Sequence, residues 1–192
     1  MPAANAGRIV FLGDSLTYDW STAGRAVWQA RYEPLGAVNC GVPGDTTADV
    51  LARIPGVFDG LVPALVVLLI GTNDLGTGSG PQQTVDGIRA CLDAVRARVP
   101  ASRVLLLALL PRGDGGPGGE RFVAMVNTRI EKLADETTRF ANLAPAFSDA
   151  KGTLHAGLYE ADELHLSTAG YKAWADALDG PLRAALVGQG YL

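Results

Sequence analysis

Five short runs of apolar residues recur along the chain, and they constrain the fold more than any other feature of the sequence. Each run is continuous rather than alternating, which is typical of strands inside a parallel sheet that helices cover on both faces. The runs are residues 8–12, 36–40, 64–70, 103–110 and, more weakly, 139–143.

Amphipathic helical patterns alternate with these runs. In residues 84–99 the apolar positions recur at steps of three and four, and residues 120–136 repeat the pattern. A last helix is expected after Ser167, whose side chain suits an N-cap.

Glycine and proline mark the joints between these elements. The stretches 41–44, 76–81 and 113–119 are predicted to be loops, and none is long enough to link two domains. Five strands that alternate with helices therefore predict a single α/β domain over residues 1–192, built as a three-layer α/β/α sandwich.

Composition narrows the chemistry. The net charge is −4 without a basic run, which argues against nucleic acid as a partner. With 2 Cys and 2 His, neither a disulfide framework nor a zinc site is expected, so no metal or cofactor is predicted. The longest apolar runs are far shorter than the ~20 residues that cross a membrane. Residues 1–7 do not resemble a targeting signal, so a cytoplasmic protein without integral membrane association is predicted.

The residues that follow the apolar runs are small, polar or titratable. Because all strands of a parallel sheet end at one edge, where open α/β proteins bind ligands, we expect these residues to gather there. They are Gly13-Asp14-Ser15-Leu16, residues 39–45, Gly71-Thr72-Asn73-Asp74 and residues 162–167.

Ser15, His165 and Asp162 have the side chains of an acyl-transfer site. A serine becomes a nucleophile only when a base takes its proton, and a neutral imidazole is the usual base. Asp162 precedes His165 by three positions, so one tight turn can bring its carboxylate to Nδ1 and leave Nε2 for Ser15. The N–H groups of Ser15 and Gly41 and the side-chain amide of Asn73 are candidate donors to the oxyanion.

Several of these residues also fit other roles. Taken alone, Ser15 fits the N-cap of the first helix and Asn73 fits a turn. Asp14 and Asp74 are predicted to be structural, with their carboxylates bonded to loop N–H groups.

Three further residues near this edge are predicted to lie outside the triad. Asp149 is the weaker rival of Asp162 because it is farther from His165 in the sequence. His155 is expected at the surface or the rim of the site. Arg112 fits both a contact with substrate and a loop position that faces solvent.

Two familiar motifs, a dinucleotide-binding loop and a nucleophile elbow, are not predicted for this chain. Residues 113–118 match G-x-G-x-x-G, but they follow the fourth run and contain a proline, so a dinucleotide site is not predicted. The elbow G-x-S-x-G is absent because Thr17 occupies its last position, which disfavours the α/β-hydrolase fold.

Four blocks of the sequence resemble those of the SGNH (GDSL-type) hydrolases, in the same order. The blocks are Gly13-Asp14-Ser15-Leu16, Gly41, Gly71-Thr72-Asn73-Asp74 and Asp162-Glu163-Leu164-His165. Residues 39–47, 109–113 and 164–167 add a likeness to the catalytic subunits of platelet-activating-factor acetylhydrolase Ib. The resemblance covers residues 10–178; the departure at Cys40 concerns packing alone.

This resemblance implies Ser15 as nucleophile, His165 as base and Asp162 as the residue that orients it. It also implies Ser15, Gly41 and Asn73 as oxyanion donors, ester hydrolysis without a metal at a shallow site, and a flavodoxin-like sheet in the order 2-1-3-4-5. The likeness to the subfamily is the one reason to expect a homodimer.

The sequence therefore predicts a serine esterase that cleaves short-chain esters of small molecules through an acyl-enzyme. Leu16, Thr72 and Leu164 flank the catalytic positions and are predicted to wall a small acyl pocket, which favours acetyl groups. A lysophospholipase or thioesterase for longer acyl chains is the alternative within the same chemistry. A binding module without catalysis on the same fold is the alternative from another class.

Overall fold

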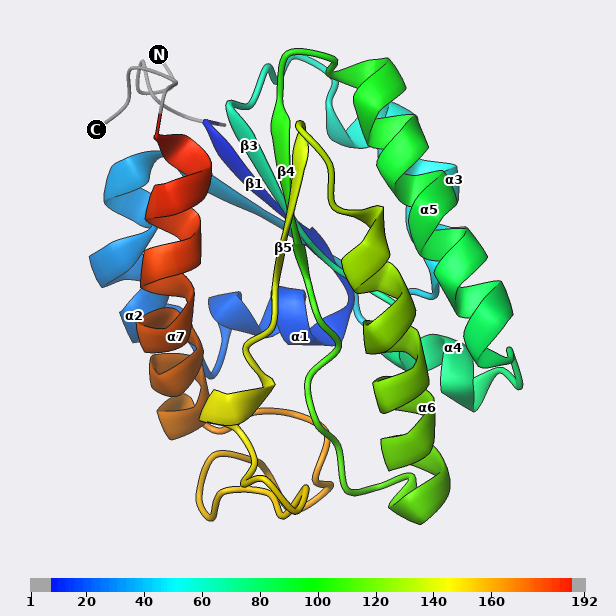
Figure 1. Ribbon diagram of the computed structural model, residues 1–192. Helices are drawn as coiled ribbons and strands as arrows, with labels where there is room; N and C mark the ends of the chain where they lie inside the picture. The colour runs from blue at the N-terminus through cyan, green and yellow to red at the C-terminus, as the bar shows by residue number, and fades with distance from the viewer. Residues whose placement is uncertain (1–7, 188–192) are drawn as a thin grey trace.

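The computed structural model describes residues 8–187 and confirms the predicted fold class. A parallel five-stranded sheet, ordered β2-β1-β3-β4-β5, lies between two layers of helices (Figure 1). The strands are β1 (Ile9–Gly13), β2 (Ala37–Gly41), β3 (Leu65–Leu69), β4 (Arg103–Leu107) and β5 (Thr138–Ala141).

Three of the longer helices cover one face of the sheet and two cover the other. In Figure 1, α3, α5 and α6 stand on one side, and α2 and α7 stand on the opposite side. The helices are α1 (Ser15–Tyr18), α2 (Arg25–Arg31), α3 (Thr47–Val57), α4 (Thr72–Gly76), α5 (Pro81–Arg98), α6 (Gly116–Ile130) and α7 (Thr168–Leu186). Short 3₁₀ turns occupy Asp19–Ser21, Glu33–Leu35, Glu131–Leu133 and Ala144–Ala146.

The strand register brings the loops of the first three strands together. Gly13, the last residue of β1, pairs with Gly41 at the end of β2 and with Leu69 at the end of β3. These strands therefore end level with one another, and the polar residues that follow them emerge at one edge.

The core consists mainly of the apolar runs predicted from the sequence. Every residue of β1 and β3 is buried, as expected for strands covered on both faces. The edge strand β2 differs, because all five of its residues are half-buried. Trp20 joins α7 to the sheet, with its ring centroid 4.7 Å from that of Tyr171 and 5.1 Å from that of Trp174.

Several predicted boundaries in the second half of the chain are wrong. The fourth run extends to residue 110, but β4 ends at Leu107, and the side chain of Asn127 bonds both N and O of Leu109 in place of a neighbouring strand. Residues 116–119 open helix α6 instead of lying in a loop, and regular helix ends at Ile130 rather than 136.

The apolar pattern of the sequence does not predict helix α3, although the start of this helix carries a local signal. The Thr46 hydroxyl accepts the Asp49 N–H, and the Asp49 carboxylate accepts the Thr46 N–H at 2.9 Å, which forms a capping box. The spacing T-x-x-D at 46–49 is the sequence signature of such a helix start. Helix α5 likewise begins at Pro81, before the expected residue 84, because proline suits the first helical position.

Candidate active site

Ser15 lies at the turn from β1 into α1 and is held from two sides. The Asp14 carboxylate accepts the N–H of Leu16 at 3.0 Å, which caps the short helix. From α7, the Tyr171 hydroxyl donates to the carbonyl of Leu16 at 2.7 Å. Ser15 is 9% exposed, so only a small part of it faces solvent.

His165 lies between Ser15 and Asp162. Its Nε2 is 2.9 Å from Ser15 Oγ, and its Nδ1 is 2.7 Å from Asp162 Oδ2. The structure therefore brings together the three residues predicted from the sequence, across a chain separation of 150 residues between Ser15 and His165. Because Asp162 occupies Nδ1, the ring has Nε2 left for the serine, as a serine hydrolase requires.

The Asp162 carboxylate is kept ionised by its surroundings. Burial acts to raise its pKa, but hydrogen bonds from the His165 side chain and from the N–H groups of Leu164 and His165 outweigh it and lower the pKa to about 2. Its Oδ1 accepts those two N–H groups at 3.0 and 2.9 Å, so the same carboxylate closes the turn and orients the imidazole.

Asp14 was predicted to be structural, and its bond to Leu16 N–H confirms this role. Its environment adds a property that the sequence does not show. The side chain is wholly buried, which raises its pKa to about 7 against the weaker lowering effects of the Leu16 N–H and of His165. Its Oδ2 is a buried atom without a hydrogen-bond partner among the described residues.

The three candidate oxyanion donors lie at the same edge but differ in their present partners. The Gly41 N–H donates to Asn39 Oδ1 at 2.9 Å, so it must leave that acceptor to reach an oxyanion. The Asn73 amide donates one N–H to the Asp45 carbonyl at 2.9 Å, and an amide has a second. Their roles as donors stay predictions.

A layer of ion pairs and hydrogen bonds behind the site fixes these loops. Arg53, on α3, bonds Asp45 Oδ2 at 2.6 Å and the carbonyl of Gly13 at 2.9 Å. Asp74 accepts both the N–H and the hydroxyl of Thr47, at 3.0 and 2.6 Å, which confirms its structural role. The part played by Arg53 was missed, because nothing in the local sequence distinguishes it from a surface arginine.

The residues predicted to wall an acyl pocket are mostly closed to solvent. Leu16 is 2% exposed and packs in the hydrophobic core, and Thr72 is 3% exposed with its hydroxyl accepting a hydrogen bond from Arg112. Leu164 is half-buried. Leu16 and Thr72 therefore expose little surface to a substrate, and the acyl pocket stays a prediction.

Of the residues predicted to lie outside the triad, Arg112 differs most from expectation. It is a buried side chain, 8% exposed, rather than a loop arginine in solvent. Asp149 accepts the N–H groups of Lys151 and Thr153 and so closes its own turn, which also lowers its pKa. His155 is exposed, as predicted.

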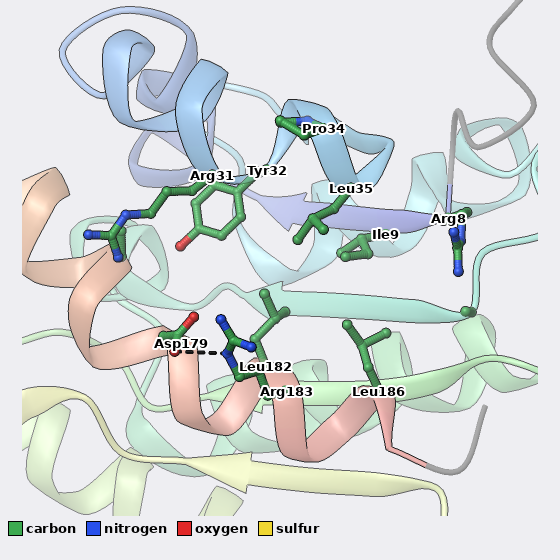
Figure 2. A pocket seen from close by; sticks show the side chains of 12 residues that line it. Arg8, Ile9, Arg31, Tyr32, Pro34, Leu35, Asp179, Leu182, Arg183 and Leu186 are labelled. Atoms are coloured by element: carbon green, nitrogen blue, oxygen red, sulfur yellow. Dashed lines mark hydrogen bonds and ion pairs between the residues drawn. The ribbon is translucent and has the colours of Figure 1, made fainter. Parts of the chain in front are cut away.

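A cavity of about 500 Å³ lies away from these residues, at the opposite edge of the sheet. It opens between α2 and α7 beside the start of β1 (Figure 2). The cations at its rim have partners, since Arg31 pairs with Asp176 and Arg183 pairs with Asp179. No residue of the triad lines it, so it takes no part in chemistry at Ser15.

Within residues 8–187, no three or more His, Cys, Asp or Glu side chains are grouped to hold a metal ion. None of the helices in this range has the length and apolar character needed to cross a bilayer.

Comparison with known proteins identifies the family. The model of the GDSL-like lipase/acylhydrolase family matches residues 11–173. Platelet-activating factor acetylhydrolase IB subunit alpha1 of Bos taurus is 34% identical over 194 residues, which cover 95% of this chain and 79% of the relative. Subunit alpha2 of Homo sapiens is 29% identical over 168 residues, with 85% and 70% covered.

Solved structures share the fold. A GDSL-like lipase of Bacteroides thetaiotaomicron has a TM-score of 0.79 at 24% identity, over 94% of this chain and 89% of its own. The psychrotrophic esterase EstA of Pseudoalteromonas sp. has a TM-score of 0.69 at 18% identity, over 92% and 99%. The family match spans most of the chain, and the bovine relative shares a third of its residues. The chain therefore belongs to the GDSL-like lipase/acylhydrolase family and is a carboxylic ester hydrolase.

Proposed function

We propose that this enzyme cleaves short-chain esters, acetyl esters above all, with Ser15 as the nucleophile. The observation that carries the proposal is the unbroken chain of hydrogen bonds from Ser15 Oγ to His165 Nε2, at 2.9 Å, and from His165 Nδ1 to Asp162, at 2.7 Å. Serine hydrolases activate their nucleophile through this arrangement.

In the first step, His165 Nε2 takes the proton of Ser15 while Oγ attacks the ester carbonyl carbon. The carbonyl oxygen becomes an oxyanion, and the candidate donors to it are the Ser15 N–H, the second Asn73 amide N–H and the Gly41 N–H. The C–O bond to the alcohol then breaks, and the alcohol leaves with the proton that His165 holds.

In the second step, water replaces the alcohol. His165 takes a proton from the water, the hydroxide attacks the acyl-serine carbonyl, and Ser15 leaves with the proton returned from His165. The Asp162 carboxylate, with its pKa lowered to about 2, is ionised throughout the pH range of this chemistry and stabilises the imidazolium in both steps.

The preference for short acyl chains is supported by burial beside the nucleophile. Leu16 and Thr72, at 2% and 3% exposure, present little surface to an acyl chain. The name of the bovine relative, an acetylhydrolase, points the same way. A lysophospholipase or thioesterase for longer chains remains the alternative, and a series of p-nitrophenyl esters from acetyl to dodecanoyl discriminates between them. A rate maximum at long chains refutes the acetyl preference.

Ser15→Ala tests the assignment directly. We expect kcat on p-nitrophenyl acetate to fall by about 10⁶-fold, as when the nucleophile of a serine protease is removed. Ser79→Ala, which removes an exposed hydroxyl, is the matched control and should keep full activity. Retention of most activity by Ser15→Ala refutes the assignment.

A fluorophosphonate probe separates an enzyme from a binding module on the same fold. We expect it to label Ser15 in the wild-type protein, because a module without catalysis has no activated serine. The homodimer and the cytoplasmic location expected from the sequence stay predictions; sedimentation of the purified protein tests the first and fractionation of its native cells the second.

A further inference from the structure

Residues 111–114, which follow β4, contact both loops that carry the proposed catalytic groups. On one side, Arg112 Nη1 donates to the carbonyl and to the hydroxyl of Thr72, at 2.6 and 2.8 Å. Thr72 directly precedes Asn73, the candidate oxyanion donor. The backbone that positions Asn73 is thus held by a buried guanidinium.

The same guanidinium is fixed by a second partner. Arg112 Nε and Nη2 bond the two carboxylate oxygens of Asp114 at 2.7 and 2.6 Å, in the planar, two-pronged geometry that arginine favours. With Nη1 on Thr72 as well, all three nitrogens of Arg112 are engaged. A lysine offers a single flexible ammonium and cannot make these bonds together.

On the other side, the segment contacts the loop of His165. The Gly113 N–H donates to the carbonyl of Glu163 at 2.9 Å, and the carbonyl of Pro111 accepts the Tyr159 hydroxyl at 2.7 Å. Glu163 lies between Asp162 and His165 and has φ +54°, a conformation that costs a residue other than glycine energy.

The approach of these two segments requires a glycine. A Cβ added at Gly113 would lie 2.4 Å from Glu163 Oε2 and 2.9 Å from Glu163 Cβ. A side chain at residue 113 would therefore push the triad loop away. Close packing and a hydrogen bond together hold Glu163 in its strained conformation.

We propose that residues 111–114 form a brace that sets the position of the Asn73 loop relative to the Asp162–His165 loop, with Arg112 as a positioning residue for ester hydrolysis. The inference rests on the proposed function. Within residues 8–187, the hydrogen bonds of Arg112 go to Thr72 and Asp114 and not to Ser15 or His165, so Arg112 acts through the backbone at Thr72. Because oxyanion donors act on charge that develops in the transition state, displacement of Asn73 lowers kcat and leaves KM nearly unchanged.

Arg112→Lys is the first test, since it keeps the positive charge and removes the guanidinium that bonds Thr72 and Asp114 together. We expect kcat on p-nitrophenyl acetate to fall roughly 10- to 100-fold, the cost of a displacement of about 1 Å in an active site, with KM within about threefold of wild type. The value of kcat is calculated per mole of Ser15 that the fluorophosphonate has labelled when the labelling is complete. Because unfolded protein is not labelled, it does not enter the comparison. Arg121→Lys, an exposed arginine on α6, is the matched control and should match wild type.

A single variant and a double variant that restores the space test the contact between Gly113 and Glu163. Gly113→Ala is expected to lower kcat per labelled Ser15, and Gly113→Ala combined with Glu163→Gly is expected to recover most of the loss. The second change removes the Glu163 side-chain atoms that the new Cβ meets, and glycine suits the positive φ at residue 163. A simple loss of stability leaves kcat per labelled Ser15 unchanged in Gly113→Ala, because the unfolded fraction is not counted.

The outcomes separate cleanly. A kcat per labelled Ser15 within twofold of wild type in Arg112→Lys overturns the brace, even where the melting temperature falls. A rise in KM at unchanged kcat also overturns it, because it places Arg112 in substrate binding. Failure of the proposed function gives a different result: the fluorophosphonate does not label the wild-type protein, or Ser15→Ala keeps its esterase activity.

Discussion

Asp14 is expected to make the stability of this enzyme depend on pH in the direction opposite to that of most carboxylates. Its complete burial raises the pKa from 3.8 to about 7. The folded protein therefore keeps this proton up to about pH 7, whereas the unfolded chain loses it near pH 4. Below about pH 4 both states hold the proton and Asp14 costs no stability; the cost grows between about pH 4 and pH 7, where only the folded protein binds the proton, and it is constant above pH 7.

The size of the effect follows from the two pKa values. At roughly 1.36 kcal/mol per pH unit, the span from 3.8 to about 7 corresponds to about 4 kcal/mol of stability lost between about pH 4 and pH 7. Asp14→Asn keeps an oxygen for the Leu16 N–H but places an amide NH₂ where Oδ2 has no partner, at a cost of about 1 kcal/mol. By pH 5 the wild type has already lost about 2 of these 4 kcal/mol, so the variant should be about 1 kcal/mol more stable than wild type near pH 5 and about 3 kcal/mol more stable near pH 8.

Urea unfolding followed by tryptophan fluorescence measures this difference. Wild type and Asp14→Asn are compared at both pH values, so that all other titrating groups cancel in the difference. Asp93→Asn, in which the carboxylate is 64% exposed, is the control and should show the same small difference at both. If the stability difference between Asp14→Asn and wild type is the same at pH 5 and pH 8, the carboxyl is not held neutral and the reasoning is refuted.

Three further outcomes follow from the geometry. Gly41→Ala should lower the melting temperature and remove most of the esterase rate, because a Cβ at residue 41 would lie 2.2 Å from a backbone nitrogen of α1. Gly56→Ala, which has open space around it, is the control in both assays. Asp162→Asn should lower kcat on p-nitrophenyl acetate by about 10²- to 10⁴-fold, since an amide no longer holds His165 in the correct tautomer, and unchanged kcat contradicts the triad. Tyr171→Phe should lower the free energy of unfolding in urea by about 1–2 kcal/mol, because the buried carbonyl of Leu16 loses its 2.7 Å hydrogen bond. An unchanged urea midpoint contradicts a stabilising role for this hydrogen bond.

The features that could be predicted from the sequence are those encoded locally. A continuous apolar run is enough to predict a covered strand, as at β3, and the step of three between Asp162 and His165 is enough to predict their contact. The ends of strands and helices were less predictable where a side chain from a distant segment takes the hydrogen bonds that a neighbouring strand or helix turn would make. The end of β4 is an example, because Asn127 on α6 takes over the bonds of Leu109.

The residues behind the site escaped prediction for the same reason. Arg53 and Arg112 are ordinary arginines in the sequence, and each matters through a backbone carbonyl 40 residues away, at Gly13 and at Thr72. No local pattern records such a contact. Leu16 shows that burial too is not recorded locally: it directly follows Ser15, yet its side chain packs in the hydrophobic core, and its place in an acyl pocket stays a prediction.

The sequence by itself determined the fold class and the proposal of Ser15, His165 and Asp162 as a hydrogen-bonded set, because strands, turns and a three-residue step depend on neighbours along the chain. Tertiary structure alone decided the depth at which each group is buried. Burial holds a proton on Asp14, closes the space beside Leu16 and Thr72, and puts the charge of Arg112 onto the Thr72 carbonyl. These effects depend on solvent exclusion and on contacts between distant segments, which exist only once the chain has folded.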